Sequence, residues 1–159
     1  MSFELLSEAA RANPSMRALA LDVGDARIGL AISDAQGIVC LPIEALVRSE
    51  EADDISVVIE TAEREHVQTI VVGLPLSLDG TQGPAARKMR RFTSVLRKTT
   101  DIPVESYDER FTTTEAERRL RSAGFEPSKH RARLDSMAAV IILESYLSSR
   151  ANRIGRNQN

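Results

Sequence analysis

The first third of the chain alternates apolar and polar positions as antiparallel strands do. In residues 17–23 one face of the expected strand is apolar, whereas the other ends on Asp22. Two more apolar runs, at residues 28–33 and 38–47, follow after short polar turns. The pattern predicts a meander of three antiparallel strands. Because Pro42 cannot donate a ladder hydrogen bond, we expect the third strand at the edge of the sheet.

From residue 51 onwards, apolar residues at helical spacing alternate with short runs that are apolar throughout. Such runs are typical of strands that are buried on both faces in a parallel sheet. Residues 137–143 are apolar almost all round a helix, so the last helix must pack against the sheet. We therefore expect an α/β fold with a five-stranded mixed sheet, three strands antiparallel and two parallel, flanked by helices. The remaining expected elements are helices at 51–65, 85–98, 112–124 and 131–149 and strands at 68–73 and 104–107.

The length of 159 residues, 42% of them hydrophobic, suits one domain that buries its own core. We expect an N-terminal extension over residues 1–15, one domain over 16–149 and a flexible tail over 150–159. The single cysteine, Cys40, lies among apolar residues, which favours a core side chain and excludes a disulfide framework or a zinc cluster. We find no signal peptide and no membrane-spanning stretch in the sequence, so we expect a cytoplasmic protein with no membrane partner. We expect it to be a monomer or a homodimer.

Charge is divided unevenly between the two halves of the chain. Residues 1–80 carry 5 Lys or Arg and 14 Asp or Glu, a net charge of −9, whereas residues 81–159 carry 16 and 9, a net charge of +7. A basic half is one sign of a surface that meets a polyanion, because clustered cations release counterions from a phosphate backbone. The alternative is a set of solvated helix faces.

Acidic residues stand where the first and the fifth strand end. Asp22 closes the first strand, at the edge where open α/β sheets place ligands, although an aspartate there can also hydrogen-bond its own turn. Glu109 follows the fifth strand, ahead of a helix, where acidic residues are common for structural reasons. If the parallel strands lie beside the first, we expect Glu109 at the same edge as Asp22, with one of Asp108 and Glu109 pointing inward.

Asp135 lies on a helix face that it shares with small and apolar residues such as Ala138 and Ile142. A carboxylate on a buried face is costly unless it is paired, hydrogen-bonded or bound to a metal ion. We favour metal binding or catalysis over a structural ion pair. The arginines that could form such a pair are Arg27, Arg131 and Arg133.

Three carboxylates brought together would repel one another unless a cation neutralised them. Oxygen-only ligands suit Mg²⁺ or Mn²⁺ rather than zinc. Two such ions roughly 4 Å apart can activate a water molecule and stabilise the leaving oxygen of a phosphodiester displacement. The sequence thus predicts a nuclease with Asp22, Glu109 and Asp135 as catalytic residues and metal ligands.

Basic residues gather on the helix over 85–98 and again just before Asp135. We expect the second group to hold phosphates near the metal ions, whereas His130, alone in a basic loop, is typical of a solvated side chain. Aromatic residues make up 4% of the chain, which argues against base stacking as the main source of affinity. The predicted substrate-binding residues are Arg27, Lys129, Arg131 and Arg133.

Four short motifs follow one another between residues 16 and 147. They are LALDVG at 19–24 with RIGLA at 27–31, VGLP at 72–75 with DGT at 79–81, DERFTT at 108–113 with EA at 115–116, and Asp135 with AA at 138–139 and IL at 142–143. Together they resemble the YqgF family of Holliday-junction-resolvase-like proteins.

The resemblance implies an RNase H-like fold and a cytoplasmic bacterial nuclease that trims the 5′ end of the small-subunit ribosomal RNA precursor. It also implies Asp22, Glu109 and Asp135 as the catalytic acids. RuvC-type resolvases, by similarity, add an acid where this chain has Ala138, which argues against junction resolution. The cleft-lining residues implied by the resemblance are Gly24, Gly73 and Pro75.

Three alternatives stay open. The first is a resolvase of four-way DNA junctions, and the second is a protein that binds nucleic acid without cutting it. The third is a phosphotransferase or ATPase module, because Asp22 and Gly24 before a strand resemble the first phosphate loop of actin-like folds, although a single domain cannot close that cleft. Since contacts to phosphate specify little, the sequence does not decide between a ribosomal RNA precursor and branched DNA.

Overall fold

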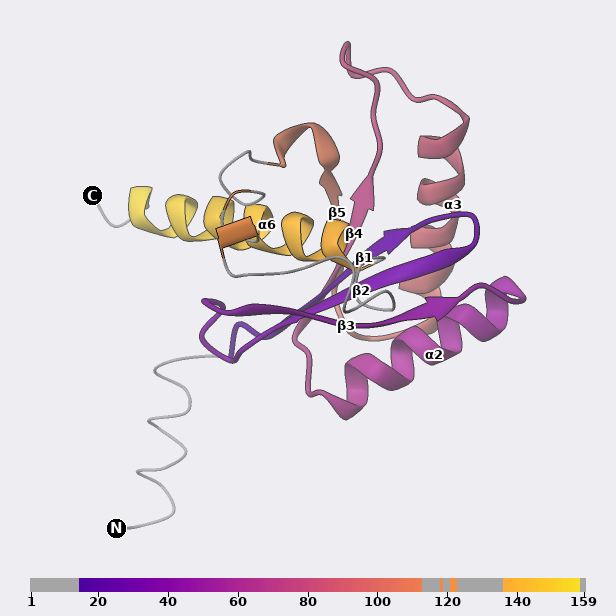
Figure 1. Ribbon diagram of the computed structural model, residues 1–159, viewed down its shortest axis with the longest axis horizontal. Coiled ribbons are helices and arrows are strands. Elements are labelled where there is room, and N and C mark those ends of the chain that lie inside the picture. The colour runs from indigo at the N-terminus through magenta and orange to yellow at the C-terminus, as the bar shows by residue number, and fades with distance from the viewer. Residues whose placement is uncertain (1–14, 113–117, 119–120, 123–135, 158–159) are drawn as a thin grey trace.

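A computed structural model describes residues 15–112, 118, 121–122 and 136–157 of the chain. The strands form one five-stranded sheet in the order β3-β2-β1-β4-β5, in which β1 runs antiparallel to β2 and parallel to β4 (Figure 1). This confirms the predicted mixed sheet. The elements are β1 (Ala18–Val23), β2 (Arg27–Ser33), β3 (Cys40–Val47), α2 (Glu51–Arg64), β4 (Thr69–Leu74), α3 (Pro84–Thr99), β5 (Val104–Asp108), a 3₁₀ turn η1 (Glu109–Phe111) and α6 (Met137–Arg156).

The sheet edge that carries β3 agrees with the position of its proline. Pro42 lies inside β3 opposite Ala31 of β2, and the other side of β3 has no neighbouring strand in the sheet. A proline is tolerated there because an edge strand can lack one ladder donor. The central strand β1 is paired on both sides, and its residues Ala18, Leu19, Ala20 and Leu21 are all fully buried.

The helices divide between the two faces of the sheet. Figure 1 shows α6 on one side and α2 with α3 on the other. Alternate residues of β1 project to opposite faces, so Leu19 and Leu21 join a core with Phe92 of α3, whereas Ala20 packs with Ala139 of α6. Small residues on the α6 face let that helix lie close to the sheet.

The last helix differs from the prediction at its C-terminal end. We predicted a flexible tail over residues 150–159, but α6 continues to Arg156. Residues 151–157 are exposed and have no apolar stripe that would reveal a helix. They are nevertheless suited to one, because Ala151 and the arginines are good helix formers and Arg153 and Arg156 complement the helix dipole in the last turn.

Two predicted helical regions fall mainly outside the described residues. These are residues 131–135 of the last helix and most of the helix over 112–124, of which Arg118, Arg121 and Ser122 are described and helical. Within the described residues, no helix is both long and apolar enough to cross a membrane.

The half-buried side chain of Cys40 packs against the α6 core. Burial raises the pKa of its thiol to about 12, which disfavours the nucleophilic thiolate at neutral pH.

Candidate active site

Asp22 and Glu109 meet at one edge of the sheet because β1, β4 and β5 are parallel and in register. Leu21 pairs with Val72, and Leu74 pairs with Asp108, so the carboxyl ends of the three strands lie side by side. Both carboxylates line one pocket of about 310 Å³. The other residues of this pocket, hereafter the carboxylate pocket, are Thr112, Ala138, Ile141 and Ile142.

Gly73 makes room for the carboxylate of Glu109. A Cβ atom at Gly73 would lie 2.6 Å from Oε1 of Glu109 and 2.7 Å from Cδ1 of Ile142, both closer than atoms can approach. The glycine therefore lets Glu109 and α6 lie directly against the backbone of β4. The structure thus identifies the two side chains that approach this glycine closely.

The surroundings of both carboxylates raise their pKa values. Burial raises the pKa of Asp22 above its ordinary value. Burial also raises the pKa of Glu109, and the negative charges of Asp22 and then Asp108 raise it further. Both acids are therefore held in surroundings that disfavour their charged forms. A divalent ion would relieve this repulsion, and two oxygen donors suit Mg²⁺ or Mn²⁺.

The structural alternative for Asp22, a hydrogen bond to its own turn, is not observed. The β1–β2 turn is closed by the backbone, where the N–H of Gly24 donates to the carbonyl oxygen of Arg27 (2.9 Å). Among the described residues, no hydrogen bond involves the carboxylate of Asp22. Its side chain is thus left for a role in the pocket.

The η1 turn decides which acid of the Asp108–Glu109 pair faces the pocket. Asp108 points away from the pocket into a bidentate ion pair with Arg110, whose Nε and Nη2 lie 2.9 Å and 2.5 Å from Oδ2, and it also accepts from the Arg110 N–H. This arginine lowers the pKa of Asp108. Asp108 therefore neutralises a cation, and Glu109 is the one that lines the carboxylate pocket.

Sequence reasoning gave Arg110 no role, yet it joins η1 to the loop after β4. Its Nη1 donates to the carbonyl oxygen of Leu78 (3.4 Å). The loop itself is closed by Asp79, which accepts from the N–H and the hydroxyl of Thr81 (2.9 and 2.7 Å), and by Gly80 at φ +84°. The signal for Arg110 was present as an arginine two residues after an aspartate, a spacing that allows this local pair.

Ser136 anchors the start of α6 beside the pocket. Its buried hydroxyl donates to the carbonyl oxygen of Ile43 (2.7 Å) and accepts from the N–H of Leu30 (3.1 Å). Both partners are backbone groups of the sheet, so the helix is fixed at the position from which Ala138 and Ile142 wall the carboxylate pocket.

Comparison with known proteins places this chain in a family. A family model described as "RuvX: Holliday junction resolvase" matches residues 16–149. The chain belongs to the RuvX family. This confirms the resemblance to YqgF-like resolvases that the four motifs indicated.

Two RuvX relatives of similar length carry the name "Putative pre-16S rRNA nuclease". One, from Anaeromyxobacter sp. (strain K), is 43% identical over 136 residues, which is 86% of this chain and 99% of the relative. The other, from Chloroflexus aurantiacus (strain ATCC 29366 / DSM 635 / J-10-fl), is 40% identical over 139 residues, covering 87% of this chain and 91% of the relative.

A solved structure with the same fold is T. thermophilus RuvC in complex with a Holliday junction substrate. The two align with a TM-score of 0.59 at 16% identity, over 86% of this chain and 96% of that one. The likeness shows that this RuvX chain has the RNase H-like fold that the motifs implied.

The other predicted site residues of this RuvX chain are placed less completely. Arg27 is exposed at the start of β2, on the turn that follows Asp22. None of the three residues expected to line the cleft, Gly24, Gly73 and Pro75, is among the residues of the carboxylate pocket. Gly24 lines a hollow on the other face of the sheet, Gly73 lies beneath the side chain of Glu109, and Pro75 follows the end of β4. Those outside the described residues are Lys129, Arg131, Arg133 and Asp135.

Among the described residues, Asp22 and Glu109 are the two acids that line the carboxylate pocket. No group of three or more His, Cys, Asp or Glu side chains that could hold a metal occurs in the described ranges. The assignment of Asp135 as a third ligand stays a prediction. It follows from the sequence, in which Asp135 directly precedes the anchored Ser136.

Proposed function

We propose that the chain is a metal-dependent endonuclease that acts in the cytoplasm on the precursor of small-subunit ribosomal RNA and matures its 5′ end. Membership of the RuvX family makes the chain a nuclease, an enzyme that hydrolyses phosphodiester bonds. The observation that carries the proposal is the pair of partly buried carboxylates, Asp22 and Glu109, in one pocket at the edge of the sheet. The names of the two relatives support the ribosomal substrate.

In the proposed mechanism, Asp22, Glu109 and Asp135 hold Mg²⁺ or Mn²⁺. When bound, the metal supplies Lewis-acid stabilisation of charge on the phosphate and lowers the pKa of a water molecule. The chain positions the acidic side chains. Gly73 leaves room for Glu109 against β4, and η1 turns Asp108 away from the pocket. Ala138, Ile141 and Ile142 form the apolar side of the pocket beside the two carboxylates.

The substrate is held by its phosphates in this proposal. Arg27 emerges from the turn next to Asp22, and Lys129, Arg131 and Arg133 precede Asp135 in the chain. Contacts of this kind position a nucleic acid without reading its sequence. The choice of cleavage site would therefore depend on the shape of the RNA.

A second candidate is the resolution of four-way DNA junctions. The description of the family model favours it, and Ala138 argues against it, because this exposed residue stands where RuvC-type resolvases add an acid. The missing carboxylate would leave the pocket with fewer metal ligands.

One experiment tests the two candidates together. We would incubate the protein with a labelled RNA that carries the 5′ leader of the ribosomal precursor and, separately, with a four-way DNA junction, in Mg²⁺, Mn²⁺ or EDTA. Cleavage of the leader that needs metal and is lost in both Asp22→Asn and Glu109→Gln supports the ribosomal nuclease. Cleavage of the junction alone would replace it with a resolvase. Binding of both without cutting in any metal would overturn the nuclease assignment.

A further inference from the structure

The exposed side of α3 is basic along its whole length. The helix contains no acidic residue between Pro84 and Thr99, and its buried side consists of Ala86, Phe92, Thr93 and Leu96, so its charged residues face solvent. Arg87, Arg91 and Lys98 fall on one line of the helix surface, four and seven positions apart. The full set of cations is Arg87, Lys88, Arg90, Arg91, Arg97 and Lys98.

Among the described residues, these cations make few polar contacts with the rest of the fold. Arg97 donates from Nε to the carbonyl oxygen of Val104 (3.0 Å). The other five cations form no hydrogen bond or ion pair with any residue in the described part of the chain. Like charges three or four positions apart on a helix repel each other. A bound polyanion would relieve this repulsion.

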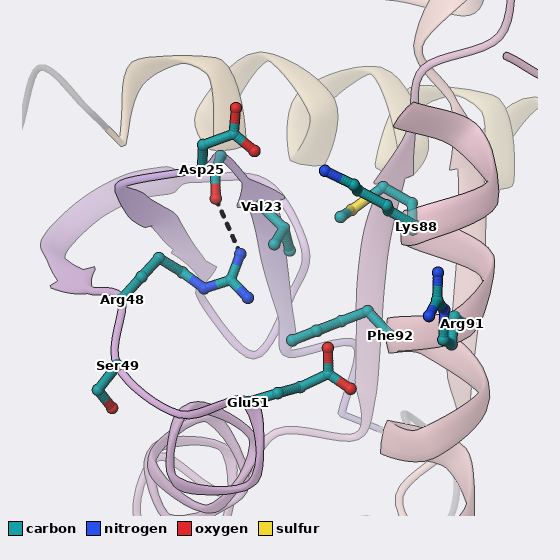
Figure 2. A pocket seen from close by; sticks show the side chains of 10 residues that line it. Val23, Asp25, Arg48, Ser49, Glu51, Lys88, Arg91 and Phe92 are labelled. Atoms are coloured by element: carbon teal, nitrogen blue, oxygen red, sulfur yellow. Dashed lines mark hydrogen bonds between the residues drawn. The ribbon is translucent and has the colours of Figure 1, made fainter. Parts of the chain in front are cut away.

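A hollow of about 350 Å³ opens beside the N-terminal half of α3 (Figure 2). Lys88, Arg91 and Phe92 reach it from α3, facing Arg48 and Glu51 at the start of α2. Arg48 is already engaged, because its Nε donates to Asp54 (2.8 Å) and its Nη1 to the carbonyl oxygen of Gly24 (2.9 Å). The acidic rim, Asp25 and Glu51, would keep an anion on the α3 side of the hollow, next to Lys88 and Arg91.

The hollow and the carboxylate pocket lie on opposite sides of one sheet edge. Val23 lines the hollow, and its neighbour Asp22 lines the carboxylate pocket, since successive residues of a strand project to opposite faces. The β1–β2 turn, with Gly24 and Asp25, separates the two. A nucleic-acid strand that crosses this turn can therefore reach the carboxylates with one phosphate and α3 with a later one.

We propose that the exposed face of α3, centred on Arg87, Lys88 and Arg91, binds the sugar–phosphate backbone of the nucleic-acid substrate beside the bond to be cut. This inference rests on the proposed function for the identity of the substrate. It gives α3 a role separate from that of Arg27 and the basic residues before Asp135, which would hold the phosphate at the metal ions. Affinity for a polyanion follows from charge complementarity and depends strongly on salt.

The test compares two double variants that remove the same charge from exposed helix surfaces. Arg87→Gln/Arg91→Gln changes α3, and Arg153→Gln/Arg156→Gln changes the exposed end of α6. Binding of a fluorescently labelled 5′-leader RNA is measured in EDTA by anisotropy, between about 50 and 200 mM salt. We expect the α3 variant to bind at least about tenfold more weakly. The slope of log affinity against log salt should become shallower by about 1.4, because two phosphate contacts to a single strand are lost.

The α6 variant should bind within about twofold of the wild type, and thermal unfolding checks that both variants are folded. Wild-type affinity in the α3 variant, or an equal loss in the α6 variant, would overturn the inference, since the effect would then be absent or a matter of net charge. Binding in EDTA needs no catalysis, so the outcome separates from the proposed function. If the wild type cleaves no substrate but the α3 variant alone binds RNA more weakly, the proposed nuclease would be refuted and the α3 binding surface would be supported.

Discussion

The two faces of the sheet are built from different residues and do different work. On the α2 and α3 face, large side chains such as Leu19, Leu21 and Phe92 fill the space under two helices. On the α6 face, Ala20, Ala31 and Ala139 bring α6 close to the sheet. The acids of the carboxylate pocket lie at the edge of this second face. We infer that the α2 and α3 face supplies most of the hydrophobic stability, and that the α6 face positions the acids of the carboxylate pocket.

This division explains how the two acids of the carboxylate pocket can lie in unfavourable surroundings. Burial and mutual repulsion disfavour the charged forms of Asp22 and Glu109, which costs the α6 face stability. The large core on the opposite face offsets that cost without touching the pocket. Changes on one face should therefore alter activity, and changes on the other should alter stability.

The largest expected effect tests the choice between two neighbouring acids. Glu109→Gln should lower the rate of cleavage by about a thousandfold or more, because it removes a charged metal ligand, whereas Asp108→Asn should cost less than about tenfold. Single-turnover cleavage at saturating Mg²⁺ measures both. An equal loss in the two variants would mean that the geometry of η1, rather than the carboxylate of Glu109, is what cleavage requires.

The next effect falls on stability. Leu96 is fully buried in α3, and Leu96→Ala should lower the free energy of unfolding by about 2–5 kcal/mol. The neighbouring Val95 is 38% exposed, so Val95→Ala serves as a control with a loss of under about 1 kcal/mol. Urea unfolding gives both values. Below its melting temperature, the Leu96 variant should keep the cleavage rate of the wild type. Lost activity in a folded variant would contradict the division of labour between the faces.

Gly73→Ala should affect the cleavage rate more than the stability. The new Cβ would meet the end of the Glu109 side chain, which can move, and Cδ1 of Ile142, which is buried, so we also expect a loss of stability of about 1–3 kcal/mol. The displaced carboxylate should lower the cleavage rate by about 10- to 100-fold, since an error of about 1 Å at a reacting group has that scale. Gly83→Ala is the matched control, because its Cβ meets nothing within 4 Å. A loss of rate in the control, or none at Gly73, would remove the proposed role of this glycine.

The order of strands and helices could largely be predicted from the sequence. In elements that pack against the sheet, the buried apolar residues recur with the period of a strand or a helix. The five strands and the helices α2 and α3 were predicted within a few residues, and so was the edge position of β3 from Pro42. The end of α6 was missed for the same reason. Residues 151–156 are exposed, so no apolar period marks them as helical.

The site could be predicted only as far as the sheet edge. Strand order brings Asp22 and the Asp108–Glu109 pair together, but the pattern alone left open which acid faces inward. That depends on η1 and on the ion pair of Asp108 with Arg110, a matter of backbone geometry over three residues. In the same way, a glycine at position 73 indicates close approach without naming the side chains that approach it.

The smallest effect concerns the stability of the protein without metal. The pKa of Asp22 is raised in the folded state, so the folded protein holds this proton more tightly than the unfolded chain. Stability therefore falls as the pH rises through that pKa, and at pH 7 the charged carboxylate destabilises the fold. In EDTA, Asp22→Asn should raise the free energy of unfolding by up to about 1 kcal/mol, a small value because the group is partly exposed.

Thermal unfolding at several pH values measures this difference. It should shrink as the pH falls through the raised pKa of Asp22, because the wild-type carboxyl then becomes neutral, and Mg²⁺ should reverse the order by stabilising only a chain with intact ligands. Asp25→Asn, on the exposed β1–β2 turn, should leave the melting temperature unchanged in each condition. An Asp22 variant less stable than the wild type in EDTA would instead make Asp22 a structural residue of its turn. Asp22 would then stabilise the α6 face of the sheet, in contrast to its proposed role as a metal ligand.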